Sequence, residues 1–176
     1  MSEMYVVNLQ EVTEAVSKAT KPVNILWQEP DSVAFVARGR PGRSEFHIDP
    51  SDEVMYVIKG TLELHYITPE GERKVTTLKE GEVVYCPAGT PHSPHFAPDA
   101  FLMVLERQRH TDEDDRFVWY CDECGAQVYE TSRHVPDYHM DPVSRVYEEF
   151  YGSEANRTCK QCGHVAPLPN APAAAR

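Results

Sequence analysis

The chain has 176 residues, of which 41% are hydrophobic, and its formal net charge is −11. This hydrophobic fraction is sufficient for a packed core and argues against a disordered chain, whereas the acidic excess argues against a nucleic-acid partner, which needs clustered lysines and arginines. No apolar run reaches the roughly 18 residues of a membrane span and the N-terminus has no secretory pattern, so we expect a cytoplasmic protein that contacts no membrane.

The first predicted element is a short helix between residues 9 and 19. Asn8 precedes it as a suitable N-cap. Apolar residues recur within it at the 3.6-residue spacing that buries one face of a helix, namely at Val12, Ala15, Val16 and Ala19.

From about residue 24 to residue 107 the pattern changes to short apolar or alternating runs, separated by turns rich in proline and glycine. The predicted strands are NILWQE (24–29), SVAFVAR (32–38), SEFHI (44–48), EVMYVIKG (53–60), TLELHYIT (61–68), RKVTTL (73–78), EVVYCP (82–87) and AFLMVLER (100–107). Many short strands at this spacing predict an antiparallel sandwich or barrel.

After this region the composition changes again, and the polar, acidic segment from His110 to Asp115 is interpreted as a connector. A helix is predicted in VSRVYEEFYG, with Asp141 as its cap, Pro142 in its first turn and a buried stripe formed by Val143, Val146, Tyr147 and Phe150. The predicted organisation is a lead-in with a helix (1–23), a barrel (24–109), a linker with a cysteine site and helix (110–167), and a disordered tail (168–176).

Two histidines and one glutamate stand in matching contexts within the predicted barrel. His47 and Glu53 flank a turn at Asp49-Pro50, and His92 follows a Pro-x-Gly turn that would fix its direction at the start of a strand. Two neutral imidazoles and one carboxylate leave about half of an octahedral shell open, which suits Fe(II) and exchangeable ligands such as O₂. We expect Asp49 to support this site rather than to bind the metal.

The same stretches resemble the two sequence motifs of the cupin barrel, a double-stranded β-helix or jelly roll. The first motif would start at Gly42, one residue closer to His47 than usual, and the spacing from Glu53 to Gly60 fits. The second runs from Gly81 through Pro87 and Gly89 to His92, with Phe96 in place of the usual asparagine. Other histidines have simpler interpretations, His95 at the rim of the pocket and His65 as a filler of the barrel wall, and Cys86 is interpreted as a small buried residue.

Four of the five cysteines form two CxxCG pairs near the C-terminus. Two residues between thiolates allow both sulfurs to face one ion, and the glycine allows the turn, so the pairs predict tetrahedral Fe or Zn ligation by Cys121, Cys124, Cys159 and Cys162. The alternatives are disulfides or unrelated surface thiols, which a reducing compartment disfavours. With no open coordination position the site is expected to be structural, or redox-active if it holds iron.

The combination of a single cupin barrel with a rubredoxin-like cysteine tail resembles the bacterial 3-hydroxyanthranilate 3,4-dioxygenase family. The resemblance includes Arg43, the segment LERQR at 105–109, FVWYCDECG from Phe117 and EEFYGSEANRTCKQCG from Glu148. It implies a homodimeric enzyme with non-haem Fe(II) that inserts both atoms of O₂ into the ring of an ortho-aminophenol.

By the same resemblance Arg43 would bind the substrate carboxylate, and Glu106 would contact the ring substituents or carry a proton. The family has a second carboxylate-binding arginine where this chain has Phe96, so 3-hydroxyanthranilate and a related amino-hydroxybenzoate or aminophenol are both expected substrates. The alternatives are a non-oxygenase cupin, such as a metal-dependent isomerase or a small-molecule-binding module, and a rubredoxin-like electron carrier fused to a sensory barrel.

Overall fold

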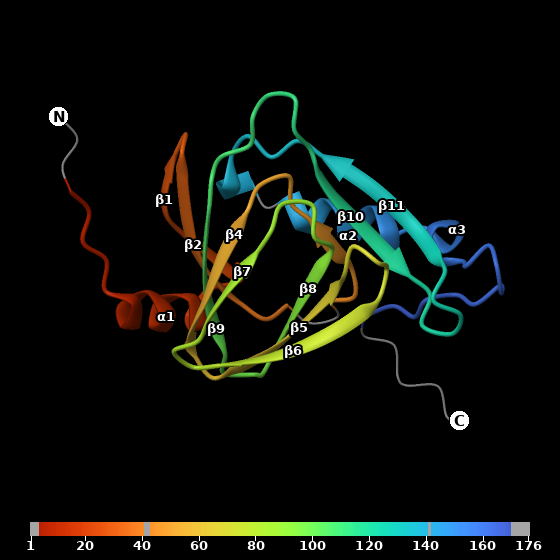
Figure 1. The fold of residues 1–176 in the computed structure, drawn as a ribbon, viewed down its shortest axis with the longest axis horizontal. Coiled ribbons are helices and arrows are strands. Elements are labelled where there is room, and N and C mark those ends of the chain that lie inside the picture. The colour runs from red at the N-terminus through yellow and green to blue at the C-terminus, as the bar shows by residue number, and fades with distance from the viewer. Residues whose placement is uncertain (1–3, 41–42, 141, 170–176) are drawn as a thin grey trace.

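The structure is a computed structural model that describes residues 4–40, 43–140 and 142–169 (Figure 1). It consists mainly of two antiparallel sheets with the strand orders β1-β2-β9-β4-β7 and β11-β10-β3-β8-β5-β6. The mainly β, cupin-type barrel that the sequence predicts is confirmed. The strands are β1 (Val23–Glu29), β2 (Ser32–Arg38), β3 (Phe46–Ile48), β4 (Glu53–Lys59), β5 (Thr61–Ile67), β6 (Arg73–Lys79), β7 (Val83–Cys86), β8 (His92–Phe96), β9 (Phe101–Glu106), β10 (Asp115–Tyr120) and β11 (Gln127–Arg133).

The core of the barrel follows from the two-residue alternation of its strands. Successive side chains of a strand point to opposite faces of the sheet, so every second residue of β4 and β9 is buried. Both sheets contribute to the resulting cluster, which shows that they pack face to face. Its buried members are Met55, Val57, Leu62, Leu64, Leu78, Cys86, Leu102 and Val104. The interpretation of Cys86 as a small buried residue is confirmed.

Helix α1 (Leu9–Lys18) begins where the sequence predicts. The side chain of Asn8 accepts hydrogen bonds from the backbone N–H groups of Gln10 and Glu11, which otherwise have no partner within the helix. Val16 is buried against Val36 of β2. The helix therefore covers the outer face of the first sheet beside β1 and β2, as Figure 1 shows.

The C-terminal part of the chain extends the second sheet. β10 pairs with β3 in the register Phe117 opposite His47, and β11 pairs with β10. The turn between β9 and β10 contains the expected connector, but Asp115, its last residue, begins β10 and is 4% exposed. The predicted connector therefore ends one residue earlier than expected, because Asp115 pairs with Arg133 of β11.

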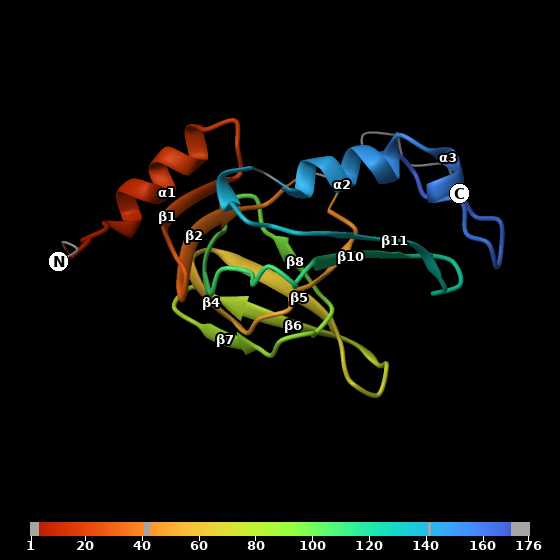
Figure 2. The ribbon, with the colours of Figure 1, turned by 90° about the horizontal axis from the view of Figure 1, so that it is seen from above.

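Three helical segments follow β11: η1 (Tyr138–Met140), α2 (Pro142–Tyr151) and α3 (Glu154–Arg157). The expected cap Asp141 lies outside the described residues, as do Gly42 of the first motif and residues 170–176 of the expected tail. The predicted apolar stripe of α2 packs on β10, where Val146 and Phe150 are buried against Phe117 and Trp119. Figure 2 shows α1 and α2 on the same side of the barrel. None of the helices in the described part of the chain is long and apolar enough to cross a membrane.

Candidate active site

The neighbouring strands β4 and β9 each carry a row of inward-facing side chains. These side chains are apolar along most of the strand, and at one end of each strand the row finishes with a glutamate. In β4 the buried positions are Val57, Met55 and then Glu53, and in β9 they end at Glu106. The alternation that builds the core thus directs both carboxylates into the same end of the barrel. Glu53 is 4% exposed and Glu106 9% exposed, so neither is solvated as a surface carboxylate would be.

The second sheet supplies two histidines at the same end. His47 of β3 and His92 of β8 are direct partners across the two strands, and their ring centroids lie 5.5 Å apart. Ligand atoms of His47, Glu53 and His92 all lie within 4.8 Å of one another, so the structure brings the predicted triad together. Phe117 of β10 stacks on the ring of His47 at 5.0 Å between centroids, which fixes the plane of that imidazole.

The donor set fits a divalent metal ion. His92 Nε2 and Glu53 Oε2 lie 3.0 Å apart, and metal–ligand bonds near 2.1 Å at right angles place two ligand atoms about 3 Å apart. Glu53 Oε2 is buried and has no hydrogen-bond partner among the described residues. Burial and the charge of Asp49 raise the pKa of Glu53 to about 8, and burial next to His47 lowers the pKa of His92 to about 3. A buried carboxylate beside a neutral imidazole is the environment that a cation stabilises.

Arg109 connects the carboxylates around this triad, and the sequence did not single it out as a site residue. Its side chain is fully buried and donates to Asp49, Glu106 and Asp115. Asp115 in turn lies 3.0 Å from His47 Nε2. Although burial opposes it, the hydrogen bond from His47 and the charge of Arg109 lower the pKa of Asp115 to about 2.

The expected supporting role of Asp49 agrees with these contacts. Its carboxylate accepts hydrogen bonds from the backbone and hydroxyl of Ser51 and from Arg109. The signal for Arg109 was its position three residues after Glu106 in the family-like segment LERQR. The signal for Asp115 was weak, because an acidic residue in a polar stretch is usually solvated.

A cavity of about 450 Å³ opens onto the triad, which is large enough for a small aromatic molecule. Arg43, Glu106 and Phe96 line the cavity. Phe96 packs closely on the backbone of Gly39, since a Cβ atom added to Gly39 would lie only 2.9 Å from the Cβ of Phe96. The apolar part of the wall comes from both sheets and from the C-terminal segment, with Ile25, Phe35, Met55, Pro94, Leu102 and Val135.

The position of His95 corrects the expectation of a pocket-rim residue. Pro94 and Phe96 of β8 line the cavity, and alternation places His95 on the opposite face of the strand. There its ring packs on that of His65, with 4.2 Å between the centroids.

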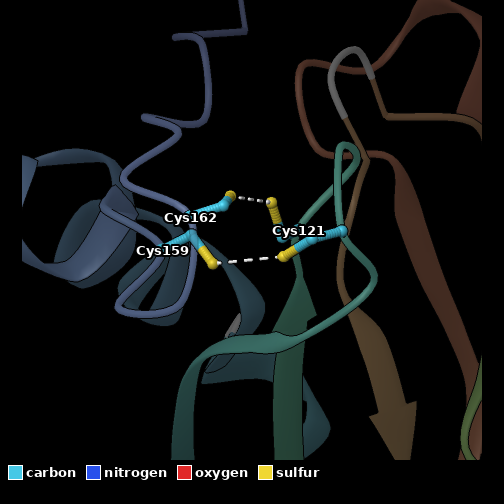
Figure 3. Close-up of side chains that lie close together, drawn as sticks. Cys121, Cys159 and Cys162 are labelled. Atoms are coloured by element: carbon cyan, nitrogen blue, oxygen red, sulfur yellow. Dashed lines mark hydrogen bonds between the residues drawn. The ribbon is translucent and has the colours of Figure 1, made fainter.

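The four cysteines converge as predicted (Figure 3). Sulfurs of Cys121 and Cys162 lie 3.6 Å apart, as do those of Cys124 and Cys159. A disulfide is about 2.05 Å long, whereas four thiolates about 2.3 Å from a tetrahedral ion lie about 3.8 Å from one another. The spacing therefore fits metal ligation and not disulfides.

Both cysteine turns have the same geometry. Gly125 and Gly163 have φ values of +74° and +77°, and each donates its N–H to the carbonyl of the first cysteine of its pair. The backbone N–H of Cys162 lowers the pKa of Cys159 to about 7, which favours the thiolate that binds metal. The glycines are required because other residues rarely adopt positive φ.

Comparison with known proteins identifies the family. The model of the 3-hydroxyanthranilic acid dioxygenase family matches residues 1–151. The chain belongs to this family. A 3-hydroxyanthranilate 3,4-dioxygenase of Bacillus cereus is 40% identical over 148 residues, covering 83% of this chain and 82% of the relative. One of Neurospora crassa is 34% identical and covers 91% and 89%. Among solved structures, a cupin-2 domain protein of Shewanella frigidimarina has a TM-score of 0.48 at 21% identity and covers 58% of this chain and 95% of that chain.

Membership of the 3-hydroxyanthranilic acid dioxygenase family confirms the expected enzyme class, a ring-cleaving dioxygenase. It implies a metal cofactor, O₂ and an aromatic substrate, and it does not favour a non-oxygenase cupin. The match ends at Tyr151 and so includes α2, while the second pair of cysteines follows it.

Proposed function

We propose that the chain is a non-haem Fe(II) dioxygenase that opens the ring of an ortho-aminophenol, with His47, Glu53 and His92 as the ligands of the metal. The observation that carries this proposal is the three-donor cluster in the wall of a cavity that is also lined by the guanidinium of Arg43 and the buried carboxyl group of Glu106. When bound there, Fe(II) supplies the activation of O₂ that amino-acid side chains cannot provide. The roles of the surrounding residues follow from their charge and burial.

Arg43 provides the anchor for an acidic substrate. Its side chain lines the cavity and is 20% exposed, and its Nε lies 3.1 Å from Glu45 Oε1. The two Nη groups at the end of the guanidinium can then bind a carboxylate end-on in a charge-assisted pair. This contact fixes one edge of the ring relative to the triad, and orientation of this kind is a main contribution of a protein to catalysis.

Glu106 is placed to hold a proton next to the reacting substituents. Burial, the hydrogen bond with Asp49 and the charge of Glu53 raise the pKa of Glu106 well above its usual value. Arg109 Nη2 lies 3.1 Å from Glu106 Oε2 and fixes its position. A carboxyl group with a raised pKa can accept a proton from a substrate hydroxyl or amine and return it, and such groups act as general acids or bases.

Phe96 determines which aminophenols fit. A second arginine at this position would add a charge-assisted contact of about 1.5–3 kcal/mol to a substrate carboxylate. The benzyl group instead offers an apolar surface against which an aromatic ring can pack. We therefore propose a substrate range that includes 3-hydroxyanthranilate and related amino-hydroxybenzoates, with tolerance for apolar substituents on the side of Phe96.

We propose that the four-cysteine site holds Fe or Zn and has a structural role. It joins the end of β10 to the segment after α3, on the extension (residues 110–167) that completes the wall of the barrel domain (24–109). Sulfur spacings that exclude disulfides support a reducing compartment and hence the cytoplasm.

We also propose a homodimer. The support is three exposed apolar side chains on β6 and β7, each of which is the edge strand of one sheet. The exposed fractions are 56% for Val75, 60% for Val83 and 58% for Tyr85. An edge strand with unpaired backbone groups and exposed apolar side chains can pair with a second copy of the chain. The mass measured in solution by light scattering tests this assignment.

The proposed function is tested by loading the protein anaerobically with Fe(II), adding O₂ and a panel of aminophenols, and recording O₂ uptake and the absorbance of the ring-opened product. His92→Ala should abolish turnover, while His95→Ala, which removes a histidine from the other face of the same strand, should retain it. Absence of O₂ uptake with every aminophenol of the panel would contradict the proposal.

A further inference from the structure

The loop that carries Arg43 is attached to the C-terminal helix α2 by three side-chain contacts. Arg40 Nη1 donates to Ser144 Oγ at 3.0 Å, Ser44 Oγ lies 2.7 Å from the hydroxyl of Tyr151, and the hydroxyl of Tyr147 donates to Glu45. The three residues of α2 are spaced by three and four positions, so they form one face of the helix. That face contacts the loop, while Val146 and Phe150 pack against β10.

Glu45 is the centre of this attachment. Its side chain is 0% exposed, and its carboxylate lies 3.1 Å from Arg43 Nε on one side and accepts from Tyr147 on the other. The backbone N–H of Ser44 donates to the same oxygen as Tyr147, at 3.3 Å. A buried carboxylate requires a cation and hydrogen-bond donors, so these contacts determine one another's positions.

The direction of Arg43 depends on this arrangement because residues 43–45 belong to no helix or strand. An arginine side chain on such a segment has many rotamers, and ordering it costs side-chain conformational entropy. Among the described residues the guanidinium of Arg43 pairs with Glu45 through Nε, so its Nη groups can face the cavity that Arg43 lines. Burial and the charge of Glu45 raise the pKa of Tyr147 far above its usual value, so its hydroxyl keeps the proton that it donates.

We infer that Glu45 and Tyr147 are positioning residues for the substrate carboxylate, and that α2 of the C-terminal extension is thereby part of the substrate-binding machinery. This inference rests on the proposed role of Arg43. It assigns to the extension a function besides metal binding: the helix holds the arginine in the direction that selects acidic aminophenols over uncharged ones.

Tyr147→Phe tests the inference with the least disturbance, since it keeps every charge and removes one hydroxyl. Dissociation constants for 3-hydroxyanthranilate and for 2-aminophenol, which lacks the carboxylate, are measured by titration calorimetry without O₂, so the result does not require turnover. We expect the affinity for 3-hydroxyanthranilate to fall by about five- to tenfold, while that for 2-aminophenol changes less than about twofold. Tyr129→Phe is the matched control, because its hydroxyl also donates to a glutamate of α2, Glu149, away from the Arg43 loop.

Glu45→Gln separates position from charge. If Glu45 acts only through its negative charge, the substitution should tighten binding of the acidic ligand 3-hydroxyanthranilate. If Glu45 positions Arg43, the substitution should weaken that binding and leave the affinity for 2-aminophenol unchanged. Thermal melting verifies that each variant is folded before titration.

Three results would overturn the inference. They are tighter binding in Glu45→Gln, equal losses for both ligands in Tyr147→Phe, and a wild-type protein that does not bind 3-hydroxyanthranilate better than 2-aminophenol. Failure of the proposed function is recognised separately, as normal ligand binding without O₂ uptake by the iron-loaded protein.

Discussion

Replacement of Arg109 by methionine should lower the stability of the protein more than replacement of any exposed charged residue would. The guanidinium is fully buried and contacts carboxylates of Asp49, Glu106 and Asp115. Removing one partner of a buried ion pair costs about 3–5 kcal/mol, because the remaining charge has no compensation. In a chain of this size each kcal/mol corresponds to about 2–4 °C in Tm, so we expect a decrease of roughly 6–20 °C.

Arg107→Met is the matched control two residues away. Arg107 pairs with Glu113, but its side chain is 28% exposed, and ion pairs near the surface contribute about 0–1 kcal/mol. Both variants are compared with the wild type by thermal melting followed by circular dichroism at pH 7. A Tm for Arg109→Met within about 3 °C of the Arg107→Met value would refute the role of Arg109 as the shared counter-ion.

The pH dependence gives a second test of the same reasoning. The pKa of Asp115 is lowered to about 2 in the folded protein, against the opposing effect of burial, by His47 and Arg109. A lowered pKa stabilises the fold above the ordinary carboxyl pKa near 4, and this contribution is lost as the pH falls towards 2. Without Arg109 the pKa of Asp115 should rise. The difference in stability between wild type and Arg109→Met should therefore be largest above pH 5 and should narrow on acidification.

Three further predictions concern the two sites. Phe96→Arg should lower the dissociation constant of a carboxylated aminophenol by about tenfold or more and leave that of 2-aminophenol unchanged. An equal change in both dissociation constants would contradict a contact between the introduced arginine and the substrate carboxylate. His92→Ala should lower the metal content by one ion per chain while the cysteine metal stays, as elemental analysis measures; loss of both ions would show that the sites are not independent. Cys121→Ser should lower Tm and the yield of folded protein but leave kcat of the folded fraction largely intact, and full loss of kcat in folded protein would contradict a structural role.

Much of this protein could be predicted from patterns within short stretches of sequence. Alternation in β4 and β9 indicated which residues face inward, and the same alternation places Glu53 and Glu106 at the end of the barrel. The CxxCG turns depend on two residues and a glycine, so their geometry is local. Asn8 capped the first helix as expected because a cap needs only its neighbours.

The partners of buried charges could not be predicted in this way. Arg109 is 60 residues from Asp49, and Tyr147 is 102 residues from Glu45. Asp115 stands in a polar stretch that is typical of a solvated segment, but it begins β10, pairs with Arg133 of β11 and is buried. Similarly, the sequence led us to expect His95 at the rim of the pocket, but in β8 the side chains of Pro94 and Phe96 face the cavity and that of His95 faces the opposite side of the strand.

The sequence by itself indicated an open metal site in a barrel and a closed four-cysteine site, because the types of ligand and their spacing limit which metals can bind. The class of reaction came from the resemblance of longer stretches to the dioxygenase family. The tertiary structure decided which charges meet, and it brings Arg109 as well as the expected Arg43 to the wall of the cavity. Those pairings depend on how sheets and helices distant in the chain pack together. Burial strengthens the interaction between paired charges and makes an unpaired carboxylate or guanidinium destabilising.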